Sequence, residues 1–179
     1  MGQDGQNPPP PSGGIITGTG ESLSWRLEIR DGRLVAHLRG EVNENADLAE
    51  LRRQLRGDVE LDLEGVARIN SCGVREWVNF VRTLEVKSLR FARCSPTVVL
   101  QLNTIYNFRG VARVKSFLAP YVCETCHVDE YKLLDTAEHF SEPSAVVPQH
   151  VPAFRCARCG GVMTFDELPE RYLAFLGEK

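Results

Sequence analysis

Four cysteines in the last third of the chain form two Cys-x-x-Cys pairs, namely Cys123 with Cys126 and Cys156 with Cys159. Two intervening residues let both thiolates of a pair reach one tetrahedral ion at a metal–sulfur distance of about 2.3 Å. The glycines at 160 and 161 permit the turn that points backbone N–H groups at sulfur. The spacing therefore predicts one Zn²⁺ ion bound by all four cysteines.

This ion is expected to be structural, because four thiolates fill the coordination sphere of zinc and leave no position for a reactive water. A thioredoxin-like redox role would need a single pair at a strand–helix junction. His127 and His150 adjoin the pairs, but neither has a better ligand spacing than the neighbouring cysteines. Cys72 and Cys94 lie next to serines in apolar surroundings, which is typical of small buried side chains. None of these four residues is assigned a metal role.

Residues 121–168 resemble a zinc-ribbon module on these cysteine pairs. The spacer predicts a strand at 131–134 and a Pro- and Ser-rich loop from 142 to 152. Met163 and Phe165 predict a short strand, and residues 166–169 begin a helix with an apolar stripe. That stripe either packs on the rest of the protein or docks a partner.

The composition predicts one main domain and one small module, because 179 residues with 42% hydrophobic content can bury one ordinary core and an appendage. The net charge is −3, and no apolar run approaches the roughly 20 residues that cross a bilayer. We therefore expect no membrane association. The N-terminal sequence lacks the features of a secretory signal, so we expect a cytoplasmic protein.

Residues 1–20 contain four consecutive prolines among Gly, Ser, Gln and Asn, which predicts a disordered tail. A polyproline ligand for an aromatic groove is the alternative. The main domain is expected at 21–120 and the zinc module at 121–179.

Apolar residues alternate at 23–29 and at 34–38 on either side of Asp31 and Gly32, which predicts a hairpin with a two-residue turn. Leucines at helical spacing follow the possible caps Asn43 and Asn45 and predict a helix that Gly57 ends.

Alternation at 59–63 and at 89–91 predicts two further strands. The strongest helical stripe runs from Val74 to Leu84, and Ser95 before Pro96 starts another helix. A final strand is expected at 111–122. This order predicts an α/β fold in which helices pack on a mixed sheet.

Three stretches, at 38–43, 61–66 and 69–74, resemble the STAS domain of anti-sigma-factor antagonists over about residues 22–120. In that family the last stretch usually reads aspartate, serine, serine or threonine, glycine, leucine, and a partner kinase phosphorylates its first serine. Ser71 matches that serine. The resemblance implies a STAS-like mixed sheet and a protein partner of the anti-sigma-factor or serine-kinase type.

Ser71 is predicted to lie at a helix N-terminus, where backbone N–H groups and the helix dipole tolerate a phosphate. Phosphorylation would change the local charge by about −1.5 to −2, enough to break a docking interface. A purely structural alternative is that Asn70 or Ser71 caps the helix. The chain has Asn43, Asn70 and Cys72 where the family usually has two aspartates and a hydroxyl residue, so an unphosphorylated binding module is the other reading. The predicted partner surface comprises Asn43, Asn70, Ser71, Cys72, Gly73 and Arg75.

We expect a non-enzymatic signalling module, since no nucleophile–base pair, phosphate-binding glycine loop or open metal site is evident. The acids Glu41, Asp62 and Glu64 are expected at strand ends and solvated. A nucleic-acid-binding or transcription-associated ribbon is the alternative. It is disfavoured because residues 121–179 carry five Lys or Arg against ten Asp or Glu.

Overall fold

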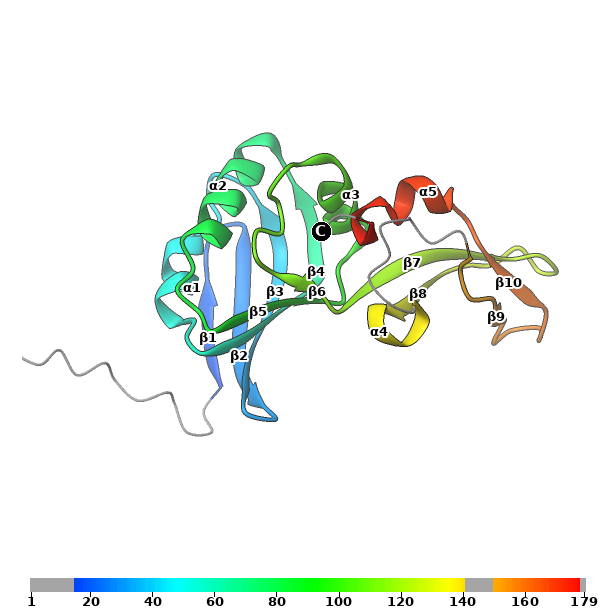
Figure 1. Cartoon of the computed structure of the whole chain (residues 1–179), viewed down its shortest axis with the longest axis horizontal. Helices are drawn as coiled ribbons and strands as arrows, with labels where there is room; N and C mark the ends of the chain where they lie inside the picture. The colour runs from blue at the N-terminus through cyan, green and yellow to red at the C-terminus, as the bar shows by residue number, and fades with distance from the viewer. Residues whose placement is uncertain (1–14, 141–149, 178–179) are drawn as a thin grey trace, which may run out of the picture.

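A computed structural model describes residues 15–140 and 150–177 of the chain, which form two sheets and several short helices (Figure 1). The first sheet has the order β1-β2-β3-β4-β5-β6. Its strands are β1 (Ile16–Thr19), β2 (Leu23–Arg30), β3 (Arg33–Val42), β4 (Asp58–Ile69), β5 (Ser88–Ala92) and β6 (Arg113–Val114). The first two pairs are antiparallel and the next three are parallel, so the predicted α/β fold with a mixed sheet is confirmed.

The predicted hairpin joins β2 and β3. Asp31 has φ +52° and Gly32 has φ +72°. A two-residue type I′ turn requires a positive φ at both of these positions. Arg30 then pairs directly with Arg33. β1 pairs antiparallel with β2, so residues 16–19 are a strand and their assignment to a disordered tail is wrong. The proline run lies outside the described residues.

Three helices, α1 (Leu48–Gln54), α2 (Ser71–Arg82) and α3 (Pro96–Thr104), contribute buried side chains to the core of this sheet. Asp47, not Asn43 or Asn45, caps α1, because its side chain accepts a hydrogen bond from the Glu50 N–H. Ser95 caps α3 as predicted. In the part of the chain that the structure describes, no helix is both long and apolar enough to cross a membrane.

The second sheet has the order β8-β7-β10-β9. It contains β7 (Ser116–Cys123), β8 (Asp129–Asp135), β9 (Phe154–Arg155) and β10 (Val162–Phe165). The single strand predicted at 111–122 is therefore wrong: it is divided at Lys115 between β6 of the first sheet and β7 of the second. The Lys115 N–H still donates to the carbonyl of Phe91, and a parallel bridge between Cys94 and Phe117 keeps the start of β7 beside the end of β5. The predicted loop at 142–152 lies mostly outside the described residues.

One hydrophobic core runs through both sheets. Phe117 on β7 stacks on Phe140, which follows α4 (Thr136–His139), and contacts Phe175 edge-on in η1 (Ala174–Leu176). Asn103 on α3 donates to the carbonyl of Tyr172 and accepts from the N–H of Phe175, which fixes α5 (Pro169–Tyr172) and η1 against α3. The C-terminal apolar stripe thus packs against the protein itself.

Candidate functional site

The four predicted metal ligands lie together at the end of the second sheet. Their sulfur atoms all lie within 4.8 Å of one another. The Sγ atoms of Cys123 and Cys159 are 3.5 Å apart, and those of Cys126 and Cys156 are 3.7 Å apart. Disulfide sulfurs are about 2.05 Å apart, whereas a tetrahedron with metal–sulfur bonds of about 2.3 Å has sulfurs about 3.8 Å apart. The arrangement fits one tetrahedral metal ion.

The pairing of β7 with β10 brings the two cysteine pairs together, because Cys123 lies opposite Met163 in that register. The Glu124 N–H also donates to the carbonyl of Val162. At Gly161 a Cβ atom would lie 2.4 Å from Oγ1 of Thr125, so the close approach of the two loops requires glycine there. The Gly161 N–H points at Sγ of Cys159 at 3.4 Å, as in the predicted turn.

Electrostatics at the cluster favour a bound cation. The N–H of Cys126 lowers the pKa of the Cys123 thiol to about 6, whereas burial raises the pKa of Cys126 to about 12. Four thiolates in so small a volume repel one another unless a cation lies between them. Among the described residues this ligand cluster consists of the four cysteines alone and includes neither His127 nor His150.

The loop before α2 contains residues of two kinds, and the first kind is structural. Asn70 is the N-cap, because its Oδ1 accepts from the Gly73 N–H at 2.7 Å, and its Nδ2 donates to Glu44. A Cβ atom at Gly73 would lie 1.9 Å from the carbonyl oxygen of Val42. Asn43 accepts hydrogen bonds from the Ser22 hydroxyl and from a backbone N–H. These three residues hold the loop against the end of β3.

The other three residues of the predicted partner surface, Ser71, Cys72 and Arg75, are exposed. The expectation that Cys72 is buried is therefore wrong, whereas Cys94 is fully buried and its burial raises the pKa of its thiol. Arg75 pairs with its neighbour Glu76, at 3.4 Å. Phosphorylation of Ser71 and partner binding at this loop stay predictions.

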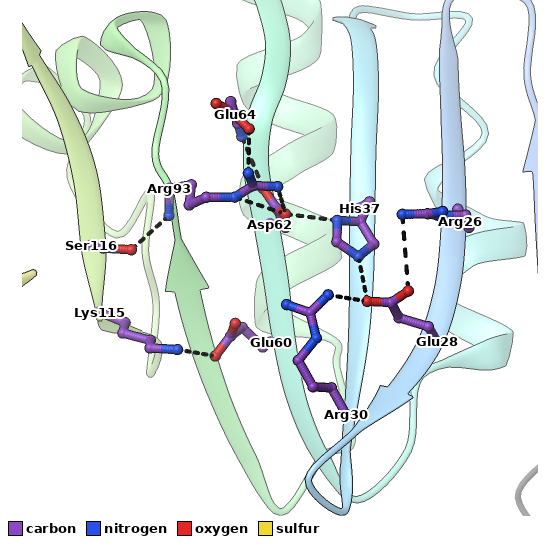
Figure 2. Close-up of polar contacts among 10 residues, drawn as sticks. All are labelled: Arg26, Glu28, Arg30, His37, Glu60, Asp62, Glu64, Arg93, Lys115 and Ser116. Atoms are coloured by element: carbon purple, nitrogen blue, oxygen red, sulfur yellow. Dashed lines mark hydrogen bonds and ion pairs between the residues drawn. The ribbon is translucent and has the colours of Figure 1, made fainter. Parts of the chain in front are cut away.

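A polar network that the sequence analysis missed covers the face of the first sheet opposite the helices (Figure 2). Asp62, expected to be solvated, is only 5% exposed. Its Oδ2 accepts from the Nε of Arg93 at 3.0 Å and lies 2.7 Å from Nδ1 of His37. On the same strand Glu60 is buried and accepts from Lys115, whereas Glu64 is exposed and pairs with Arg93.

Arg93 has a left-handed backbone, with φ +48°, which is strained for a residue with a long side chain. Its N–H donates to the Ser116 hydroxyl at 2.9 Å, and its guanidinium contacts Asp62 and Glu64. These contacts hold the strained conformation in place. A pocket of about 320 Å³ adjoins Arg93 where the first sheet meets β8. Both acidic and basic side chains line it.

One sequence signal could have revealed this network. Acids at 60, 62 and 64 alternate with Val59, Leu61 and Leu63. A strand with one apolar and one acidic face predicts basic partners on the adjacent strands.

No protein-family model matches the chain, and a comparison with curated proteins finds no match.

Proposed function

We propose that this protein is a non-enzymatic protein-interaction module, a STAS-like regulator whose second sheet is a ribbon stabilised by one structural Zn²⁺ ion. The observation that supports it best is the cluster of four cysteine sulfurs within 4.8 Å of one another. Four sulfur ligands in tetrahedral spacing suit zinc and leave no open position for catalysis.

The test of the metal is elemental analysis of the protein purified under reducing conditions without added metal. We expect one zinc per chain, and its release when a thiol reagent blocks the cysteines. Cys126→Ser should lose the zinc, whereas the matched variant Cys72→Ser, at an exposed cysteine outside the cluster, should retain it. Protein that is fully reduced and folded but holds no metal would contradict the zinc assignment.

The partner surface is the exposed part of the loop and first turn of α2, formed by Ser71, Cys72 and Arg75. Two features support it: these side chains are exposed, while Asn70 and Gly73 fix the backbone beneath them. A rigid loop with exposed side chains suits docking to a protein of the anti-sigma-factor or serine-kinase type. A phosphate on Ser71 would lie at the N-terminus of a 12-residue helix, so it would alter docking without unfolding the protein.

Affinity purification from the native cell with wild-type, Ser71→Glu and Arg75→Glu proteins tests this surface. We expect both variants to lose a partner that the wild-type protein retains. Arg82→Glu is the matched control, because Arg82 is exposed at the opposite end of the same helix. Mass spectrometry of the native protein should detect phosphate on Ser71. If all four proteins retain the same partners, the interface lies elsewhere.

A further inference from the structure

Among the described residues, β8 and β9 are the two edge strands of the second sheet, and β8, with seven residues against two, is the longer. The Cys123 N–H donates to the carbonyl of Val128 in register with the β7–β8 ladder, so these two residues form a hydrogen-bonded pair. Bonded and non-bonded pairs alternate along an antiparallel ladder. The backbone groups of Asp129, Tyr131, Leu133 and Asp135 therefore point away from β7.

At one end of this edge the protein supplies its own partner. The Asp135 N–H donates to Nδ1 of His139 at 3.1 Å. The outward backbone groups of Asp129, Tyr131 and Leu133 have no hydrogen-bond partner within residues 15–140 and 150–177. The free stretch is therefore 129–133, with Tyr131 at its centre. No bulge interrupts the β7–β8 register, so the edge is regular and suited to pairing with another strand.

We propose that a second copy of this chain binds this edge, so that β8 pairs antiparallel with the partner's β8 about a two-fold axis at Tyr131. In this register Tyr131 lies opposite the partner's Tyr131, and Asp129 lies opposite the partner's Leu133. Every free backbone group of the stretch then finds a partner, as self-complementary two-fold interfaces require. The inference is independent of the partner surface on α2.

The charges of β8 favour the same register. Within one chain Lys132 Nζ already lies 2.9 Å from Oε1 of Glu130. In this register Glu130 also lies opposite the partner's Lys132, and two-fold symmetry repeats this pair, so the four charges alternate in sign. Sliding the strands by one hydrogen-bonded step instead places Lys132 opposite its own copy and Asp129 opposite the partner's Asp135. Like charges directly opposite are unfavourable. Free backbone groups and charge thus select one alignment.

The side chains of the edge also leave apolar surface to cover. Tyr131 is 57% exposed and Leu133 is 47% exposed. Both lie on the sheet face of Leu118 and Pro120, their register partners on β7, and not on the face that holds Phe117 and Tyr121 in the core. Pairing brings the two Tyr131 rings together on this face. An interface of five residues from each copy is small, so we expect a weak, concentration-dependent dimer.

Analytical ultracentrifugation of the full chain tests the dimer. The mass should rise from the 20.0 kDa of one chain toward twice that value with concentration. Glu130→Lys and Lys132→Glu should each remain monomeric, because each creates two like-charge pairs. A mixture of the two variants should dimerise, because every cross-strand pair is then of opposite sign. The double variant Glu130→Lys/Lys132→Glu should also recover the dimer.

A covalent readout checks the register. Tyr131→Cys should form a disulfide-linked dimer under mild oxidation, because directly opposed Cα atoms of a bonded pair are about 5.5 Å apart. Leu133→Cys is the matched control, since its copy lies four residues away in this alignment. A chain that stays monomeric up to about 1 mM overturns the proposal, and so does a dimer that both single charge variants leave unchanged.

Discussion

The Nδ1 atom of His37 lies 2.7 Å from Oδ2 of Asp62, across the two parallel strands β3 and β4. The Nε2 atom of the same ring lies 3.1 Å from Oε1 of Glu28 on β2. Ionised carboxylates only accept hydrogen bonds, so a ring N–H of His37 is the donor to them. One histidine therefore links three strands on the face of the sheet that the helices leave open (Figure 2).

We predict that His37→Ala changes how stability depends on pH. The hydrogen bond from His37 is the main cause that lowers the pKa of Glu28 below its usual 4.5. A lowered pKa in the folded state contributes stability above the unfolded pKa, and this contribution is lost as the pH falls through the folded value. His37→Ala should thus raise the Glu28 pKa, seen by NMR titration, and make the acid-side loss of stability shallower.

The same substitution should cost about 1–2 kcal/mol of unfolding free energy at neutral pH, because it removes the side chain that contacts the carboxylates of both Glu28 and Asp62. Urea titrations measure this change. Arg26→Ala is the control, because Arg26 is exposed and its nitrogen lies 3.9 Å from Glu28. Equal effects of the two substitutions would contradict the assigned role of His37.

Substitutions around α2 should separate packing from capping. Trp77 is 1% exposed and donates its Nε1–H to the carbonyl of Phe108, so Trp77→Ala should cost about 3–5 kcal/mol. Asn70→Ala should cost about 1 kcal/mol as a lost N-cap. Ser71→Ala should stay within about 0.5 kcal/mol, because Ser71 is exposed and is not the cap. Thermal melts of the three variants rank these losses of stability. A large loss for Ser71→Ala would be inconsistent with Asn70 as the N-cap.

Gly73→Ala should destabilise the protein by about 1–3 kcal/mol, because the added Cβ meets a backbone carbonyl that cannot rotate away. Gly32→Ala is a useful contrast: its added Cβ meets nothing within 4 Å and adds only backbone strain. Chemical denaturation of both variants tests this. A smaller loss at Gly73 than at Gly32 would show that the end of β3 moves freely.

Loss of the metal should loosen the second sheet more than the first. Cys156→Ser removes one ligand of the cluster, and metal binding is coupled to local folding. Hydrogen exchange should then accelerate at β10 and at the end of β7, while β3 and β4 stay protected. Uniform acceleration over both sheets would instead indicate that the shared core unfolds as one unit.

The second sheet should not bind nucleic acid through phosphate contacts, because acidic residues outnumber basic ones in residues 121–179. Fluorescence anisotropy with duplex DNA and single-stranded RNA should show no affinity that falls steeply with salt. Submicromolar binding that weakens sharply between low and physiological salt would support the alternative function.

Local patterns in the sequence determined much of this protein. The Cys-x-x-Cys spacing predicted which sulfurs would meet, because two residues are enough to place both thiols on one ion. Asp31-Gly32 and Ser95-Pro96 predicted a turn and a helix start, because φ and capping are properties of a few adjacent residues. Alternation at 59–63 predicted β4 and its buried face.

Only the tertiary structure decided which residues meet across that sheet. Asp62 contacts His37 on one neighbouring strand and Arg93 just after the other. The apolar periodicity of a single segment does not predict contacts between residues on different strands. The division of the last predicted strand at Lys115 and the place of β8 at the edge of the described second sheet depend in the same way on strand order. Apolar periodicity reports which side of a strand is buried, whereas the partners of its polar side are set by the register and order of strands far apart in the chain.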